Sequence, residues 1–358
     1  MDSTENVPVR IGIIGCGVIA QYHARALREW PDAQLVAVAD LREEAARKTA
    51  SEFNVPHVST DPHALLENPE VDAVILALPT HARTALGLAA FHAGKHVLTE
   101  KPVALNAAEV NALMAAQGDL VGACCSSRHR FTETARRAAA FIASGALGQL
   151  RHLRCRVVTP AGPPPTTAPP VWRLSRAMNG GGILVNWGCY DLDFLLGLAG
   201  WSLVPRRVLG NTYGVSPQFA ARLPQGSDAE THVAGFVTFE GGVTLSYERA
   251  ELYPGPAEAA WEITGTEGTL RMAMMPREGR LVVFERAPAA GGTEETVLWS
   301  GQESWDDIHF GPVRDFVAAI REHRSPLTGL KESLVVAKIS DAVYVSAASG
   351  EAAEITLS

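Results

Sequence analysis

The chain has 358 residues, of which 47% are hydrophobic, and it carries a formal net charge of -8 with a pI of about 5.8. This length predicts two domains with a large apolar core, and the acidic balance argues against nucleic acid or an anionic membrane as a partner. The five cysteines form no CxxC pair or zinc-like spacing, and neither a signal-peptide core nor an 18-residue apolar run occurs, so we expect a reduced, cytoplasmic, soluble protein without a metal.

The first forty residues predict a dinucleotide-binding unit. Residues 9–14 (VRIGII) form an apolar run of strand length, residues 15–20 read GCGVIA, and a second apolar run over 34–39 ends at Asp40. Glycines after a strand permit a tight turn and bring the backbone close to a pyrophosphate, which the N-terminus of the next helix stabilises. The expected cofactor contacts at this turn are Gly15, Gly17, Val18 and Ile19.

The end of the second strand bears on which cofactor is bound. The carboxylate of Asp40 favours NAD, because it accepts hydrogen bonds from the ribose hydroxyls and repels a 2′-phosphate. Arg42, two residues later, is able to receive that phosphate. We therefore expect both residues to contact the cofactor and predict NAD, with NADP left open.

Residues 1–127 continue as alternating strands and helices. We expect strands over residues 71–78, 96–99 and 120–126, and helices over residues 82–93 and 106–117. Such alternation predicts a parallel, doubly wound α/β sheet whose ligands bind at the carboxyl ends of its strands. This first domain is expected to bind NAD(P).

Residues 128–358 have a different pattern. We expect helices over residues 134–144, 183–198, 308–322 and 330–348, a long strand over 149–158, and several strands between about 204 and 299. Consecutive strands with short connections predict an antiparallel sheet in a second α/β domain. The proline-rich residues 159–170 are either an ordered surface loop near the site or a plain connector, and the sequence favours neither.

Lys101 follows the strand over residues 96–99 and precedes Pro102. Proline restricts the backbone of the residue before it, so Lys101 would be held at the strand's carboxyl end, facing the nicotinamide. The alternative is a solvated lysine, which is common after a strand.

Several motifs occur in an order that resembles the Gfo/Idh/MocA family of oxidoreductases. They are the glycine motif, Pro79-Thr80-His81, GKHVLTEKP over residues 94–102, Arg130-Phe131, Trp172-Arg173 and Gly180-Gly181-Gly182. The resemblance implies a Rossmann domain followed by an α/β domain with a large, open, mostly antiparallel sheet. It also implies NAD(H) or NADP(H), a sugar or cyclitol substrate, a homodimer or homotetramer, cofactor contacts from Pro79, Thr80 and Glu100, and a catalytic role for Lys101, which would contact cofactor and substrate.

The helix after the triple glycine carries the second catalytic candidate. At α-helical spacing Asn186, Tyr190 and Asp193 share one face. The family commonly has aspartate and histidine at the first two positions, and some members use tyrosine at the second as the acid/base. Tyr190 is therefore our candidate for proton transfer, assisted by Lys101, whereas an amide at Asn186 orients a hydroxyl but shuttles no proton. The alternative for Tyr190 is a core residue.

Other polar residues are candidates for holding the substrate. Besides Lys101 and Tyr190, the expected contacts are Arg130, Trp172, Asn186, Asp193 and His309. Arginines here would bind a carboxylate or phosphate, or would be paired with acidic side chains.

The predicted function is hydride transfer between a nicotinamide and a hydroxyl or carbonyl carbon of a sugar, cyclitol or related polyol. One alternative is a redox-assisted glycosidase with the same fold, in which transient oxidation permits elimination at a glycosidic carbon. Another is a cofactor-sensing regulator without catalytic activity, to which Asn186 gives some support.

Overall fold

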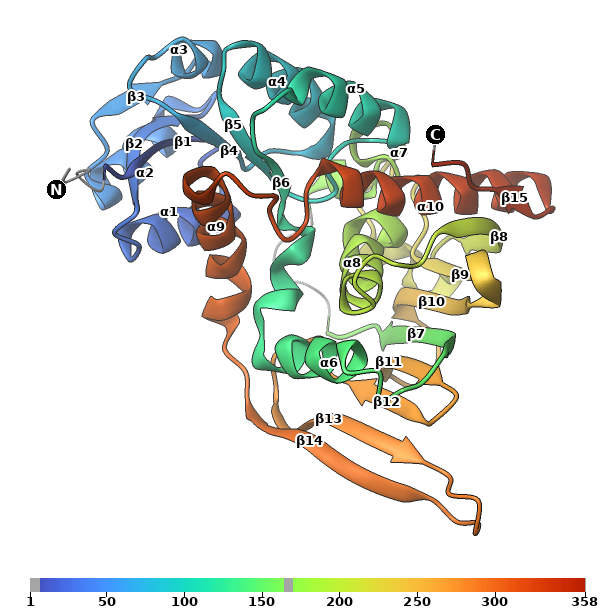
Figure 1. Ribbon diagram of the computed structural model, residues 1–358. Helices are drawn as coiled ribbons and strands as arrows, with labels where there is room; N and C mark the ends of the chain where they lie inside the picture. Colours follow the sequence, from blue (N-terminus) through green and yellow to red (C-terminus); the bar gives the residue numbers. More distant parts are fainter. Residues whose placement is uncertain (1–6, 164–169, 358) are drawn as a thin grey trace, which may run out of the picture. The chain divides into compact units, whose positions relative to one another are not determined.

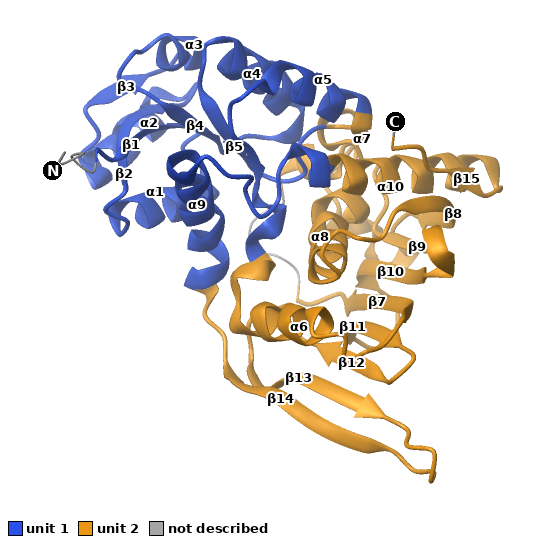
Figure 2. Cartoon of the chain, in the orientation of Figure 1, with its two compact units in different colours: residues 1–104, 108–128, 306–333 blue, residues 105–107, 129–305, 334–358 orange. Residues whose placement is uncertain are grey.

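The computed structural model describes residues 7–163 and 170–357 (Figure 1). It divides into two compact units (Figure 2). Unit 1 comprises residues 1–104, 108–128 and 306–333, and unit 2 comprises residues 105–107, 129–305 and 334–358. The expected single boundary after residue 127 differs from this division, because residues 306–333 return to unit 1 from near the end of the chain.

Unit 1 contains a six-stranded sheet in which each pair of neighbouring strands is parallel, in the order β3-β2-β1-β4-β5-β6. This is the doubly wound order of Rossmann folds, with the switch between β1 and β4. The strands are β1 (Val9–Ile14), β2 (Ala33–Ala39), β3 (His57–Ser59), β4 (Ala73–Leu76), β5 (His96–Thr99) and β6 (Gly122–Cys124). The predicted parallel α/β sheet is confirmed.

Helices flank these strands, and their apolar sides fill the core of the unit. They are α1 (Val18–Arg28), α2 (Glu43–Phe53), α3 (Pro62–Leu66), α4 (Thr80–His92), α5 (Ala107–Gln117) and α9 (Trp305–Glu322). Phe310, Val313 and Phe316 of α9 belong to the same buried cluster as Ile11 and Ile13 of β1. Burial of this apolar face explains why a helix so late in the sequence belongs to unit 1.

The sixth strand is shorter than the 120–126 run that we expected. After Cys124 the chain enters the 3₁₀ helix η1 (Cys125–Phe131). Ser127 Oγ donates to the carbonyl of Cys124 at 3.1 Å, and Arg128 Nε donates to that of Cys125 at 3.2 Å. Side chains that bond nearby carbonyls in this way compete with strand pairing, so the strand ends early.

Unit 2 contains a nine-stranded sheet in the order β14-β13-β12-β11-β7-β10-β9-β8-β15. Neighbouring strands are antiparallel except for the parallel pair β7 and β10, so the predicted mostly antiparallel sheet is confirmed. The strands are β7 (Leu150–Pro160), β8 (Pro205–Tyr213), β9 (His232–Phe239), β10 (Thr244–Tyr253), β11 (Glu258–Gly265), β12 (Thr269–Met272), β13 (Glu278–Arg286), β14 (Glu294–Gln302) and β15 (Ala353–Glu354).

The two faces of this sheet differ in character. Leu153 and Cys155 of β7 join a core built with α6 (Glu133–Ala143), α8 (Cys189–Leu198) and α10 (Leu330–Ser349). Alternate residues of a strand point to opposite faces, so Arg154 and Arg156 lie on the other side, where both pair with Glu258. Over β7 and β11 this second face therefore carries ion pairs.

Shorter helical segments complete unit 2. They are η2 (Val171–Leu174), α7 (Arg176–Asn179), the π-helix η3 (Leu184–Gly188), η4 (Pro217–Arg222) and η5 (Glu240–Gly242). Residues 164–169 of the proline-rich segment lie outside the described residues, so neither interpretation of that segment is resolved. Among the described residues, no helix combines the length and the apolar character needed to cross a membrane.

Candidate active site

Gly15 and Gly17 of the first turn have different surroundings, so glycine is needed at each position for a different reason. Gly15 has φ +94°, and a Cβ placed on it would lie 2.4 Å from the carbonyl oxygen of Ala77, so the fold itself requires glycine. Gly17, the N-cap of α1, has φ −77°, and a Cβ there would meet no described heavy atom within 4 Å outside its chain neighbours. The open space above Gly17 adjoins the free N–H groups of α1, as binding of a pyrophosphate requires.

Asp40 links the end of β2 to this turn. Its Oδ2 accepts a hydrogen bond from the N–H of Cys16 at 2.8 Å, and its Oδ1 accepts one from the N–H of Arg42 at 2.9 Å. An ionised carboxylate has about four acceptor positions, so capacity for ribose hydroxyls remains. The side chain of Arg42 is exposed, and its Nε lies 3.5 Å from Oδ1. Both cofactor candidates therefore lie beside the glycine turn.

The residues after β4 begin helix α4. Pro79 is its N-cap and Thr80, its first residue, is fully buried. Arg83 of α4 is also buried: its Nε donates to the carbonyl of Leu78 at 2.8 Å, and its Nη1 donates to the carbonyl of Pro102. Arg83 thus holds the segment just after Lys101, a role that the sequence did not indicate.

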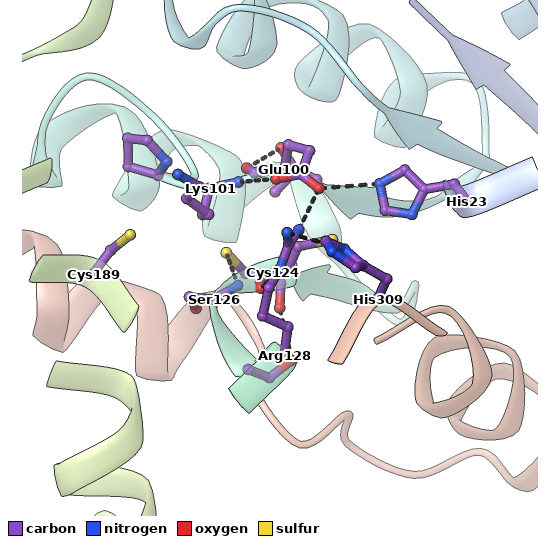
Figure 3. Close-up of polar contacts among 12 residues, drawn as sticks. His23, Glu100, Lys101, Cys124, Ser126, Arg128, Cys189 and His309 are labelled. Atoms are coloured by element: carbon purple, nitrogen blue, oxygen red, sulfur yellow. Dashed lines mark hydrogen bonds and ion pairs between the residues drawn. The ribbon is translucent and has the colours of Figure 1, made fainter. Parts of the chain in front are cut away.

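Glu100 is a buried carboxylate at the carboxyl end of β5, beside Lys101 (Figure 3). Its Oε1 accepts hydrogen bonds from Arg128 Nη2 at 2.6 Å and from His23 Nε2 at 3.1 Å, and its Oε2 accepts one from the N–H of Lys101 at 3.2 Å. Through this last bond the side chain of Glu100 holds the main chain of Lys101. The Lys101-Pro102 peptide bond is cis.

The electrostatics of this cluster keep Glu100 ionised. Burial alone would raise the pKa of Glu100, but Arg128, His23 and Lys101 outweigh burial and hold that pKa well below its usual value. His309 of α9 lies beside the same arginine, with Nδ1 3.4 Å from Arg128 Nη1. Burial, followed by the charge of Arg128, lowers the pKa of His309 to about 4, so its ring is neutral at pH 7 and accepts from the guanidinium.

One group of metal-ligand residues occurs in the part of the chain that the structure describes. The ligand atoms of His23, Glu100 and Cys125 lie within 4.8 Å of one another. Arg128 already supplies a positive charge to Glu100, and burial raises the pKa of the Cys125 thiol well above its usual value. A guanidinium and a protonated thiol disfavour a cation here, so the geometry supports an ion-pair cluster.

In unit 2, the triple glycine forms the turn that leads into η3 and α8. Gly180 has φ +83°, and a Cβ on Gly182 would lie 1.9 Å from the carbonyl oxygen of Glu230. The buried Glu230 carboxylate accepts from the N–H groups of Gly182 and Leu184 at 2.9 and 3.1 Å, and from Tyr344 Oη at 2.9 Å. Glu230 satisfies the otherwise free N–H groups of this helix start, and the sequence carried no local signal for it.

The helix that carries Tyr190 is not α-helical throughout. Its first five residues, Leu184–Gly188, form a π-helix, which changes the spacing on which a shared face of Asn186, Tyr190 and Asp193 depended. Asn186 is half-buried, whereas Asp193 is fully buried and its Oδ1 lies 2.9 Å from Arg130 Nε. Arg130 and Asp193 therefore form a buried ion pair, and two expected substrate contacts bind each other.

Tyr190 lies in the core of unit 2 with 3% of its surface exposed. Its ring makes edge contacts with His129 at 5.0 Å and with Trp187 at 5.6 Å between centroids. Trp172 lies in η2 and is half-buried, and its neighbour Arg173 pairs with Glu251 at 2.6 Å. Lys101 and Tyr190 belong to different compact units, and their joint action on one substrate stays a prediction.

Comparison with known proteins identifies the family. A model described as an oxidoreductase family with an NAD-binding Rossmann fold matches residues 9–121, and the GFO/IDH/MocA C-terminal domain matches residues 135–271. The dTDP-3,4-didehydro-2,6-dideoxy-alpha-D-glucose 3-reductase of Streptomyces violaceoruber is 31% identical over 307 residues, 82% of each chain. The myo-inositol 2-dehydrogenase of Thermotoga maritima is 33% identical over 187 residues, 52% of this chain and 53% of that protein.

A solved structure of levoglucosan dehydrogenase in complex with NADH and levoglucosan has the same fold. It superposes with a TM-score of 0.84 over 98% of this chain and 100% of that chain, at 22% identity. This likeness shows the fold, and the family matches show the class of the protein. The chain belongs to the Gfo/Idh/MocA family of oxidoreductases, and its Rossmann domain is NAD-binding.

Proposed function

We propose that this protein is an NAD-dependent dehydrogenase or reductase that transfers hydride at a hydroxyl or carbonyl carbon of a sugar, a cyclitol or a related polyol. The observation that carries this proposal is the placement of Lys101 at the carboxyl end of β5, in the region where Rossmann domains bind their ligands. The relatives named above act on an inositol and on sugar derivatives, which supports this substrate class.

The bound nicotinamide would supply the hydride acceptor or donor, and the protein would supply orientation and charge. The open space at Gly17 and the remaining acceptor capacity of Asp40 fit a dinucleotide. Lys101 would donate a hydrogen bond to the reacting oxygen and stabilise the charge that develops on it. Tyr190 is our candidate for moving the proton of that oxygen.

The substrate contacts belong to the same proposal. Asn186, Trp172 and His309 are half-buried and carry polar groups suited to sugar hydroxyls. Recruiting Arg130 or Asp193 to a substrate would separate a buried ion pair, and separating such a pair costs about 3–5 kcal/mol. A structural role for that pair therefore has more support than substrate binding.

We further propose a homodimer or homotetramer in the cytoplasm. The face of the nine-stranded sheet that carries the exposed side chains of Leu209, Tyr213 and Phe236, on β8 and β9, is a candidate subunit surface. All five cysteines are buried thiols, which suits a reducing compartment. Size-exclusion chromatography with light scattering tests the oligomer directly.

The test of function is a panel of sugars, ketosugars, inositols and levoglucosan, assayed with NAD and NADP at the absorbance band of reduced nicotinamide. Cofactor reduction, or the reverse reaction with a ketosugar, supports the proposal. Cleavage of a glycoside without net NADH formation would favour the glycosidase alternative. Binding of NADH without turnover of any compound would favour a regulator.

The role of Tyr190 needs a separate measurement on the best substrate of that panel. Tyr190→Phe keeps the ring packing against His129 and Trp187 but removes the hydroxyl. We expect a lower kcat and an altered pH profile. An unchanged rate and profile would show that Tyr190 only packs in the core.

A further inference from the structure

We infer that Tyr22, His23, Arg128 and His309 form a ring of contacts that positions Lys101 through Glu100 and connects it to the cofactor-binding end of α1. The inference rests on the proposed role of Lys101. It assigns positioning functions to four residues, of which only His309 belongs to the expected site. It is argued from contacts within unit 1 alone.

The ring begins and ends on two consecutive residues of α1. His23 Nε2 contacts Glu100 Oε1 at 3.1 Å, and the same oxygen accepts from Arg128 Nη2 at 2.6 Å. Arg128 Nη1 lies 3.4 Å from His309 Nδ1, and the His309 ring stacks on Tyr22 with centroids 4.2 Å apart and planes 29° apart. Figure 3 shows Glu100 between His23 and Arg128, with His309 beside the arginine.

Because these groups are buried, water cannot replace the contacts between them. His23 is 1% exposed, and Glu100 and Arg128 are also buried, so each polar group depends on the partner that the ring gives it. A buried ionised carboxylate with two fixed donors on one oxygen has little freedom to rotate. Its other oxygen, Oε2, is then directed at the N–H of Lys101, 3.2 Å away.

The remaining side of the Lys101 turn is held independently. Arg83 donates to the carbonyl of Pro102 while its Nε is bound to the carbonyl of Leu78. The Glu100 ring therefore constrains the chain before Lys101, and Arg83 constrains the chain after it.

The position of His23 gives the ring its connection to the cofactor. His23 lies five residues after Val18, about 7.5 Å along the axis of α1 from the turn expected to bind pyrophosphate. A dinucleotide bound at that turn restricts the motion of α1. Because His23 of α1 contacts Glu100, the motion of Glu100 and of the Lys101 backbone is then restricted as well. Cofactor binding should thus order the turn that carries the lysine.

Hydrogen exchange of the full chain, measured by mass spectrometry on peptides that cover residues 99–104, tests this connection. NADH is the probe, and no turnover is needed. In the wild-type protein we expect NADH to slow exchange in this segment. In His23→Leu we expect exchange without NADH to be about tenfold faster and the effect of NADH on the segment to be lost.

Two further variants separate positioning from general stability. In His23→Gln the side-chain amide nitrogen replaces Nε2 and should restore slow exchange and the response to NADH. His96→Asn is the matched control: His96 lies at the opposite end of β5, where its Nδ1 accepts from the N–H of Val121 at 2.8 Å, and asparagine preserves an acceptor. This control should leave exchange over residues 99–104 unchanged.

The outcomes distinguish this inference from the proposed function. If residues 99–104 of His23→Leu exchange as fast as in the wild-type protein, both with and without NADH, the ring does not position Lys101. If His23→Leu fails to fold, the double variant Glu100→Gln with Arg128→Met removes both charges together, and an unchanged segment there would overturn the ring equally. If the wild-type protein binds no NADH, the proposed function fails, whereas the variants without NADH still test the positioning of Lys101.

Discussion

Each compact unit contains a buried carboxylate paired with an arginine, and the two clusters have different surroundings. Glu100 in unit 1 is bound by Arg128 and His23 and also holds the main-chain N–H of Lys101. Asp191 in unit 2 accepts hydrogen bonds from the side chains of Arg249, Trp261 and Tyr247.

The electrostatic balance also differs between the clusters. Neighbouring positive charges outweigh burial at Glu100 and lower its pKa, whereas at Asp191 burial outweighs Arg249 and raises the pKa. Burial and pairing with arginine are common to both clusters, so neither identifies a functional carboxylate. What distinguishes Glu100 is its bond to the backbone of a catalytic candidate. The predictions below test this difference, from the largest effect to the smallest.

Removing the carboxylate of the structural cluster should have the largest effect. Asp191→Ala leaves Arg249 buried without its counter-charge, and we expect the free energy of unfolding to fall by about 3–5 kcal/mol. Denaturant unfolding followed by tryptophan fluorescence measures this change. Asp191→Asn keeps one acceptor oxygen, for Trp261 Nε1, and its amide nitrogen can donate to the hydroxyl oxygen of Tyr247, so this variant should cost less. Equal stability of Asp191→Ala and wild type would contradict a structural role.

Lys101→Ala should affect turnover instead of stability. We expect kcat to fall at least about a hundredfold, or about 2.7 kcal/mol, because the donor to the reacting oxygen is lost. NADH affinity, measured by fluorescence titration, should change little. Lys95→Ala, at the opposite end of β5 and bound there to the carbonyls of Asn68 and Val71, is the control. Normal turnover in Lys101→Ala would remove this residue from the mechanism.

His309 should make stability depend on pH. Its pKa in the folded protein, about 4, lies below the value of 6.5 expected when unfolded. The neutral ring therefore stabilises the fold fully above about pH 6.5, and this stability is lost as the pH falls from 6.5 towards 4. After allowance for partial exposure we expect a loss of about 2 kcal/mol.

His309→Phe keeps an aromatic ring against Tyr22 but does not titrate. Burial also lowers the pKa of His96 and His152, so the informative quantity is the difference in unfolding free energy between wild type and variant at each pH. We expect this difference to change between pH 6.5 and 4. A constant difference across that range would show that His309 does not contribute to the pH dependence.

The smallest expected effect on stability is that of Gly17→Ala. Comparing it with Gly15→Ala separates a glycine needed for the cofactor from a glycine needed for the fold. Gly17→Ala meets open space at an ordinary φ, so stability should be unchanged or higher by up to about 1 kcal/mol. NADH binding should weaken about tenfold, because the added methyl group occupies the approach of the pyrophosphate. Gly15→Ala should instead destabilise the fold. Unchanged NADH affinity in Gly17→Ala would place the cofactor elsewhere.

Much of the fold could be predicted from local patterns. The strand at Val9–Ile14, the glycine turn and Asp40 follow each other within about thirty residues, and the hydrophobic period and the turn residues are both visible over that distance. The same reasoning extended β6 too far, because side-chain bonds to the carbonyls of Cys124 and Cys125 compete with strand pairing. It also assumed α-helical spacing before Tyr190, where the chain forms a π-helix.

The sequence by itself determined the two α/β units, the glycine turn after β1 and the candidate Lys101, because each depends on residues close together in the chain. Only the tertiary structure revealed the partners of Glu100, which come from α1 and η1. It also revealed the contact of Arg128 with His309 of α9 and the carboxylate of Glu230 at the start of the Tyr190 helix. Contacts between residues 28 to 181 positions apart leave no periodic pattern in the sequence, since packing of the core, and not local spacing, brings them together.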